Sequence, residues 1–344
     1  MSRKFISTAL IGLCALAVAW GIPCAVTAEE PADEEGMVME AVDRRHRYLS
    51  RKLLQAAESI NAFVMNRFRS TDEQESEIIR QFYGDRQSAY DVEGSYLRIS
   101  QVAAFASRDD EDFKTRFSVR LRLADISDRL QFFADSEEAD HNVMGDVYSA
   151  RYRRELERER REGGEAGLAY FFTDRLQRDL SLSGGMRFRP EPSPRTRLRT
   201  RVRWPFEVWR AQLTQSLFWD LENGFGEKSQ AEFRRPIRED YVFRLTSAAV
   251  WSELSEGVDW SQFAAFFASL SRRRSASLLM GVRGHTHPST VTDQYVIRVR
   301  YRQRIYRDWL YVGVEPGADF FKDDGYRFAP LINLKMEIYV GSYG

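Results

Sequence analysis

Cysteine is almost absent from this chain, and both copies, Cys14 and Cys24, fall within the first 28 of its 344 residues. A disulfide framework, a thiolate metal site and a cysteine nucleophile are therefore excluded for the rest of the chain. Net charge is absent too, because 51 basic residues balance 51 acidic ones. Nucleic-acid-binding proteins usually carry a basic excess, so this balance argues against nucleic acid as a partner.

Long hydrophobic runs are also missing, since no stretch of 18 or more apolar residues follows residue 28. A membrane-spanning helix needs about 20 such residues, so a helical membrane protein is excluded. The aromatic content of 13% excludes a disordered chain. Lysine is scarce, with six copies among the 51 basic residues, so arginine supplies nearly all positive charge. A GC-rich genome and a need for permanently protonated guanidinium groups both explain this bias.

The first 90 residues predict two segments that differ from the remainder. Arg3 and Lys4 precede a mostly apolar stretch, and the small residues before Glu29 resemble a cleavage site, which predicts a signal peptide over 1–28. A membrane anchor is the alternative. Residues 29–90 predict an acidic, helical, periplasmic segment whose apolar residues recur at helical spacing. These stripe residues are Val42, Leu49, Leu53, Ala56, Ile60 and Phe63. The stripe indicates packing against the rest of the protein, a partner-binding helix or a plug.

From residue 91 to residue 344 the apolar residues alternate with polar ones. Phe117, Val119 and Leu121, for example, alternate with basic residues, as a strand with one apolar face requires. This pattern predicts about 14 strands, with 12 as the alternative number. The spans are 95–104, 114–124, 128–136, 166–174, 178–189, 195–204, 208–219, 228–235, 241–252, 258–271, 274–285, 293–304, 308–316 and 327–340. Most are long enough for a tilted strand to cross a bilayer, which takes about 9–11 residues.

Two further features fit a membrane barrel. Short links, such as 175–177 and 272–273, alternate with longer ones, such as 137–165, and this is the layout of outer-membrane barrels. Six tryptophans fall at or near predicted strand ends, where indole prefers the membrane–water boundary. They are Trp204, Trp209, Trp219, Trp251, Trp260 and Trp309. A soluble secreted β-sandwich is the alternative, but it gives no reason for tryptophan at both ends of its strands.

The architecture from about residue 95 to residue 344 resembles the outer-membrane β-barrel proteins of Gram-negative bacteria. The resemblance implies an all-β, transmembrane, antiparallel up-and-down β-barrel in the outer membrane, preceded by an α-helical segment. It also implies outer-membrane lipid, lipopolysaccharide and the barrel-assembly machinery as partners. The run Ile332 to Val340 looks like the last strand that this machinery recognises, although here Gly344 follows the aromatic Tyr343. A periplasmic partner of the helical segment is a further expectation.

If the apolar face meets lipid, the alternating arginines line the lumen. The predicted pore-lining residues are Arg120, Arg122, Arg187, Arg189, Arg197, Arg199, Arg201, Arg203, Arg298, Arg300 and Arg302. Inward acids are expected to be far fewer, with Glu232, Glu315 and Glu337 the clearest. A wall rich in guanidinium concentrates anions and repels cations, so we expect a channel or binding pore for small anionic solutes.

Several alternatives remain open at this point. The acidic segment at 29–35 could neutralise the positive wall and leave a plugged, structural or anchoring barrel. The strand at 258–271 is apolar on both faces, so one side is expected to pack against an internal plug or another subunit. Gln215 and Gln262 fall on the predicted lipid faces of their own strands, which a register error or bulge explains, or alternatively an oligomer interface. A barrel enzyme acting on lipid or lipopolysaccharide is the third function.

The enzyme reading has little local support in the sequence. The candidates for acid–base catalysis or metal binding are the four histidines, His46, His141, His285 and His287. His141 follows several carboxylates in the longest link, and His285 and His287 sit at a strand end. No spacing sets up a triad or a known metal motif, so we predict no catalytic residue, no metal and no cofactor.

Overall fold

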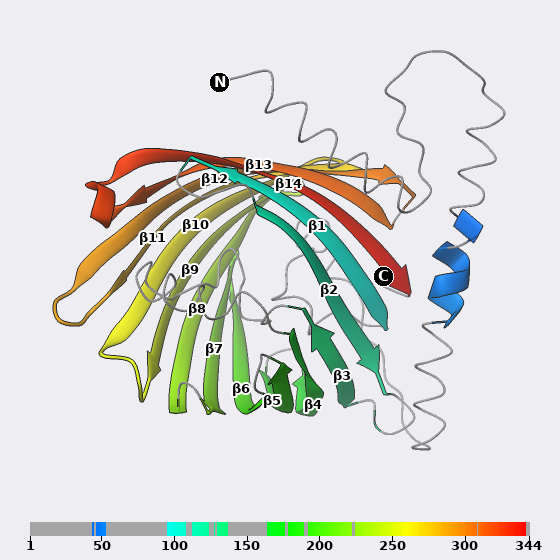
Figure 1. The fold of residues 1–344 in the computed structure, drawn as a ribbon, viewed down its shortest axis with the longest axis horizontal. Coiled ribbons are helices and arrows are strands. Elements are labelled where there is room, and N and C mark those ends of the chain that lie inside the picture. The colour runs from blue at the N-terminus through cyan, green and yellow to red at the C-terminus, as the bar shows by residue number, and fades with distance from the viewer. Residues whose placement is uncertain are drawn as a thin grey trace, which may run out of the picture.

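The computed structural model describes residues 43–44, 46–52, 95–107, 112–123, 127, 129–136, 164–175, 178–188, 192–221, 224–307 and 309–341. The fourteen strands that lie within these ranges form one closed barrel in which each strand pairs with its neighbours in sequence (Figure 1). The strands are β1 (Tyr96–Ala106), β2 (Asp112–Arg122), β3 (Leu130–Asp135), β4 (Gly164–Arg175), β5 (Arg178–Phe188), β6 (Ser193–Phe206), β7 (Trp209–Asp220), β8 (Gly224–Arg238), β9 (Tyr241–Ser252), β10 (Val258–Ser271), β11 (Arg274–His285), β12 (Val291–Tyr306), β13 (Leu310–Phe321) and β14 (Arg327–Gly341).

The barrel is closed by its first and last strands, which run antiparallel in continuous register from Tyr96↔Gly341 to Ala106↔Leu331. The start of β1 and the end of β14 therefore lie at the same end of the barrel. The two-residue turns that join β6 to β7, β8 to β9 and β10 to β11 lie at this end as well. We call it the short-turn rim and the opposite end the long-loop rim. The fold class and the strand number predicted from the sequence are both confirmed.

Strand boundaries agree best where alternation is unbroken, as in β9 and β10, which the sequence predicted at their observed bounds. β13 was predicted to end at Pro316 but continues to Phe321. In the ladder between β13 and β12, Gly317 pairs with Arg298 and Val314 pairs with Tyr301, so Pro316 and Glu315 between them are not part of the ladder. Because proline has no backbone N–H, it interrupts the ladder locally without ending the strand. β8 begins earlier than predicted, at Gly224.

A short helix within 43–52 lies against the barrel at the short-turn rim, beside the end of β14 (Figure 1). The Tyr306 hydroxyl donates a hydrogen bond to Asp43 Oδ2 over 2.8 Å. His46 Nε2 donates to the carbonyl oxygen of Tyr339 over 2.7 Å. The Gly341 N–H donates to Ser50 Oγ over 3.2 Å. The helix therefore provides hydrogen-bond partners for backbone groups of β14 beyond Ile338, where β14 no longer pairs with β13.

The docking side of this helix differs from the predicted apolar stripe. Leu49, the one stripe residue within the described helix, is exposed, whereas Asp43 is buried. Val42, Leu53, Ala56, Ile60 and Phe63 lie outside the described residues, as do the predicted signal peptide and most of the acidic segment. None of the helical turns in the described ranges has the length and hydropathy that a bilayer crossing requires.

Candidate functional site

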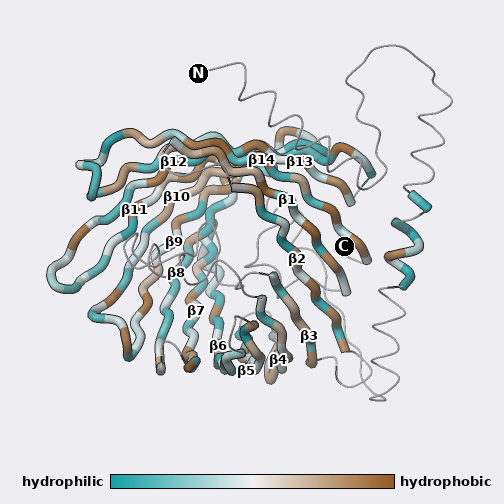
Figure 2. The backbone as a smooth tube through the Cα atoms, viewed as in Figure 1, coloured by the Kyte–Doolittle hydropathy of each residue, from teal (hydrophilic) through white to brown (hydrophobic). Residues whose placement is uncertain are grey.

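The barrel wall has two chemically different faces, which the register defines. Leu198 pairs with Leu217 and Leu182 on one face, and these side chains are about 40% exposed (39%, 44% and 39%). Arg244, Glu232 and Thr246 belong to the other face and are at most 2% exposed. We call these the apolar face and the polar face. Figure 2 shows the corresponding alternation of hydrophobic and hydrophilic residues along the strands.

The predicted arginines that the structure describes all lie on the polar face. The cross-strand partners of β6 illustrate this, because Arg197, Arg199 and Arg201 face Ser183, Ser181 and Asp179 of β5 in turn. Arg120 and Arg122 share the face on β2, Arg187 on β5, Arg203 on β6, and Arg298, Arg300 and Arg302 on β12. Arg189 lies outside the described residues.

The polar face also carries more carboxylates than the sequence predicted. Arg120 Nη2 lies 2.8 Å from Asp135 Oδ2, and both side chains are 0% exposed. Arg298 Nη2 lies 2.8 Å from Asp319 Oδ1, and Arg195 Nη1 lies 3.4 Å from Glu165 Oε2. Glu165 and Asp319 lie just outside the predicted strands 166–174 and 308–316, and Asp135 lies near the end of the predicted strand 128–136 but was not counted among the inward acids. The sequence analysis therefore underestimated how many arginines of the polar face are paired with carboxylates.

Several of these carboxylates are shared between two cations. Asp179 Oδ2 lies 3.5 Å from Arg201 Nη1 and 3.1 Å from Arg203 Nη2. Glu337 contacts Arg302 Nε at 2.9 Å and Lys335 Nζ at 3.0 Å. Glu232 likewise contacts Arg234 and Arg244. Within these contacts two cations share one carboxylate, and the carboxylate lowers the positive potential around both of them.

Three phenylalanines on the polar face each lie over a glycine of the paired strand. Phe263 pairs with Gly281, Phe218 with Gly226 and Phe133 with Gly167. A Cβ placed on these glycines would come within 2.0, 2.2 and 2.9 Å of the respective ring. The rings therefore occupy the space that a side chain would fill, which is how aromatic residues cover glycines in β-sheets.

Each of these rings also carries an arginine above it. The guanidinium carbons of Arg283, Arg195 and Arg120 lie 5.1, 6.0 and 5.7 Å from the ring centroids of Phe263, Phe218 and Phe133. Such contacts are cation–π interactions, which strengthen when they are desolvated. The glycine, the ring and the guanidinium form a layered unit that we call a Gly–Phe–Arg stack. Alternation along a single strand could not predict these stacks, because the Phe263 stack joins residues of two strands and the other two stacks join residues of three.

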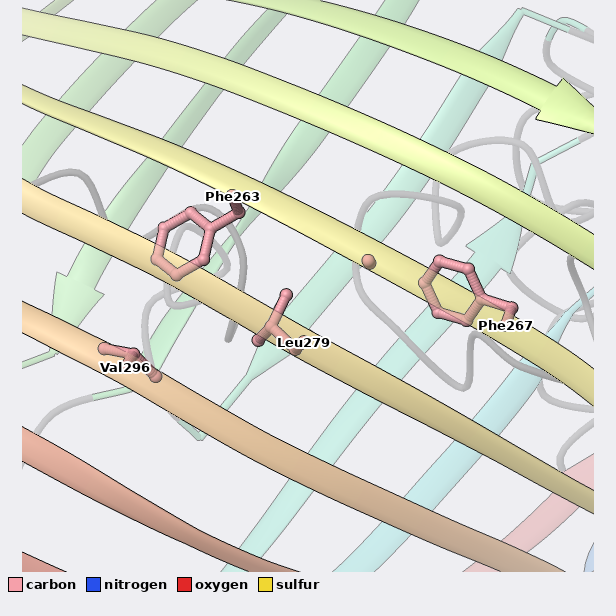
Figure 3. Close-up of a cluster of buried hydrophobic side chains, with 5 residues drawn as sticks. Phe263, Phe267, Leu279 and Val296 are labelled. Carbon is pink, nitrogen blue, oxygen red and sulfur yellow. The ribbon is translucent and has the colours of Figure 1, made fainter.

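The strand that the sequence predicted to be apolar on both faces is β10. Its polar-face residues Phe263, Ala265 and Phe267 form a buried cluster with Leu279 and Val296 of β11 and β12 (Figure 3). The polar face is therefore not uniformly charged, since an apolar strip interrupts it. Arg244 lies 5.2 Å from the Phe267 ring and continues the charged surface beside the strip.

The two glutamines predicted on the apolar face are there, and neither results from a register error. Gln215 sits in unbroken pairing with Thr200 and Ser229. It accepts a hydrogen bond from Ser229 Oγ over 2.9 Å and donates one to Glu227. Gln262 pairs with Ser247 and Val282 without a bulge. The bulge interpretation is therefore wrong.

The six tryptophans fall at the two rims. Trp204 and Trp209 lie on β6 and β7 at the short-turn rim, and Trp309 lies in the adjacent β12–β13 link. Trp219, Trp251 and Trp260 lie at the long-loop rim. Trp309 is buried, and its ring is stacked on the His46 ring with 4.4 Å between centroids. Trp204, Trp219 and Trp251 are exposed on the apolar face.

The histidines within the described residues are dispersed. His285 Nδ1 donates to Asp293 Oδ2 over 2.7 Å, while His287 is exposed near Glu256. His46 belongs to the helix at the opposite rim, and His141 lies outside the described residues. In the described ranges, no group of three or more histidine, cysteine, aspartate or glutamate residues is placed to hold a metal. A shallow recess on the polar face, with essentially no room for a water molecule, is lined by Phe133, Glu165, Ser183, Gly185, Arg195 and Arg197.

Comparison with known proteins gives likenesses of fold only. No family model matches the chain, and no curated protein matches it either. Among solved structures, OpdK of Pseudomonas aeruginosa with vanillate is 10% identical, with a TM-score of 0.43, and covers 73% of this chain and 99% of that one. A loop-deletion mutant of OmpT, an outer-membrane protein of Vibrio cholerae, is 10% identical, with a TM-score of 0.42 and coverage of 71% and 98%. The KdgM porin is 8% identical, with a TM-score of 0.36 and coverage of 72% and 99%.

Proposed function

We propose that this protein is an integral outer-membrane β-barrel that binds and passes small anionic solutes along its polar face. The support comes first from the wall itself. A closed antiparallel barrel leaves no unpaired strand edge, as a bilayer requires, and its exposed apolar face suits lipid. The polar face then lines the interior, where converging side chains bury one another.

The observation that carries the anion preference is the sharing of carboxylates between two cations. Asp179, Glu232 and Glu337 each contact two basic side chains, and the polar face of β6 carries five arginines and no carboxylate, which supports a positive potential in the interior. Arg197 and Arg199 continue this charge along β6 and are only half buried. Rings of fixed cations favour the entry of anions and raise their local concentration.

A second function is favoured by the burial of the polar face. Arg120, Arg187 and Arg283 are at most 4% exposed, whereas side chains that line a wide water-filled channel remain hydrated. This observation supports a constricted barrel with a structural or anchoring role. The ion pairs across the wall would then serve mainly to hold the strands together.

The same proposal implies a route of export and an orientation of the barrel in the outer membrane. We infer export by a signal peptide over 1–28, insertion by the barrel-assembly machinery, and contact with lipopolysaccharide on the outer side. The short-turn rim would face the periplasm. The exposed Trp219 and Trp251 would lie at one lipid–water boundary, and Trp204 at the other.

The deciding experiment is ion selectivity in planar bilayers under a salt gradient. We expect a reversal potential that reports anion preference, and a lower anion-to-cation permeability ratio for Arg197→Gln and Arg199→Gln. Lys322→Gln, which removes an exposed cation from the β13–β14 link, is the matched control and should leave the ratio unchanged. Cation selectivity would contradict the proposal, and a complete lack of conductance would favour the constricted barrel.

A further inference from the structure

The helix within 43–52 docks through one side only. Asp43, His46 and Ser50 are spaced three and four residues apart, so they share one helical face, and each contacts the short-turn rim. Arg307 adds an ion pair to Asp43. These contacts fix the rotation of the helix about its own axis, and therefore fix which residues point away from the barrel.

The wall beneath the helix belongs to the apolar face. Leu310, Ile338 and Val340 lie on that face by register but are only 5%, 4% and 2% exposed. Further along the barrel, apolar-face residues such as Val299 remain about half exposed, at 47%. Trp309, on which His46 stacks, belongs to the same buried cluster as Leu310. The helix thus sits where the outer wall meets the rim, at the level of a membrane boundary.

The side of the helix that points away from the barrel is basic. Arg44, Arg51 and Lys52 are exposed on this side, while Arg47, which is also exposed, lies beside the docking face and donates to the carbonyl oxygen of Asp43. Asp43 is the one carboxylate in the described part of the helix, and it is buried against the barrel. Tyr48 is exposed between the cations, and its ring lies 5.8 Å from Lys52 Nζ. A helix with cations and an amphipathic aromatic on its free side matches the surface of an anionic lipid leaflet.

We propose that this helix is an interfacial anchor whose basic side binds the anionic phospholipid headgroups next to the short-turn rim. The inference rests on the membrane placement of the barrel given above, but it does not depend on anion transport. The docking contacts hold the helix at the boundary in advance, so little ordering is needed when the headgroups bind. Each cation near such a surface strengthens binding about five-fold.

The test uses the full chain, folded into phosphatidylcholine vesicles with and without phosphatidylglycerol. Tyr48→Cys supplies a site for an environment-sensitive fluorophore, because Cys14 and Cys24 fall in the predicted signal peptide. We expect a blue shift of the label when phosphatidylglycerol is present, and its reversal by high salt.

Two double variants, each removing two positive charges, distinguish lipid binding by the helix from a general effect of positive charge at the short-turn rim. Arg51→Gln with Lys52→Gln should lower the ratio of lipid-bound to water-exposed label about 25-fold. Arg272→Gln with Arg273→Gln, in the exposed β10–β11 turn at the same rim, should leave that ratio unchanged.

The possible results separate the two proposals. Equal spectra in the two vesicles, or equal effects of the two variant pairs, would overturn the anchor, leaving water or a periplasmic protein as the neighbour of the helix. Failure of the unlabelled chain to enter either vesicle would instead refute the membrane placement.

Discussion

The Gly–Phe–Arg stack at Gly281 provides the sharpest prediction of stability. In Gly281→Ala the new Cβ would lie 2.0 Å from Cδ1 and 2.2 Å from Cε1 of Phe263. These distances are far inside van der Waals contact, so the ring must leave its place. Phe263 is 1% exposed and belongs to a buried cluster with Phe267, Leu279 and Val296, so displacing the ring disturbs these neighbours.

The cost follows from two losses. Overpacking of a close-packed interior costs about 1–3 kcal/mol. Displacement of the ring also removes the Arg283 contact at 5.1 Å, which contributes about 0.5–2 kcal/mol. We therefore expect Gly281→Ala to lower the free energy of unfolding by about 1.5–5 kcal/mol, the sum of the two terms.

The control is Gly184→Ala, since Gly184 has nothing within 4 Å of an added Cβ. Because glycine in a strand interior costs about 0.5–1 kcal/mol relative to alanine, this variant should be slightly more stable than the natural chain. The assay is urea unfolding of the barrel in lipid vesicles, followed by tryptophan fluorescence. Combining Gly281→Ala with Phe263→Ala should cost less than the sum of the single changes. Equal midpoints for Gly281→Ala and Gly184→Ala would refute the reasoning.

Two further predictions use the same unfolding assay. Arg120→Ala removes the ion-pair partner of Asp135 in a fully buried site, so it should lower the free energy of unfolding by about 3–5 kcal/mol. The double variant Arg120→Leu with Asp135→Leu leaves no buried charge at this site and should lower it less. A double variant that is less stable than Arg120→Ala would contradict this. Leu198→Arg places a cation on the apolar face, so it should cost about 2–4 kcal/mol in a bilayer, and an unchanged midpoint would show that this face does not meet lipid.

Alternation along the strands was sufficient to predict the architecture. The two faces of β6, with Arg197, Arg199 and Arg201 on one side and Leu198 on the other, follow from the period of two alone. The same rule placed Gln215 and Gln262 correctly on the apolar face. Each of these assignments needs only the residue's own strand, and this is why the sequence predicted them.

The contacts that the sequence did not predict depend on residues in other strands. The ion pair between Arg120 and Asp135 requires the pairing of β2 with β3, and the stack on Gly281 joins β10 and β11. Helical periodicity left open whether the stripe that includes Leu49 packs against the barrel, binds a partner or forms a plug, and it did not predict that the helix docks through polar groups that satisfy open backbone positions of β14. A hydrophobic pattern carries no information about such hydrogen bonds.

The seam between β1 and β14 makes the position of the chain ends arbitrary. Eleven residue pairs join these strands without a shift, the same number as join β9 to β10 within the chain. A circularly permuted gene that links residue 341 to residue 95 and opens the chain within 137–163 should therefore yield the same barrel, because the wall has no first or last strand once it has formed.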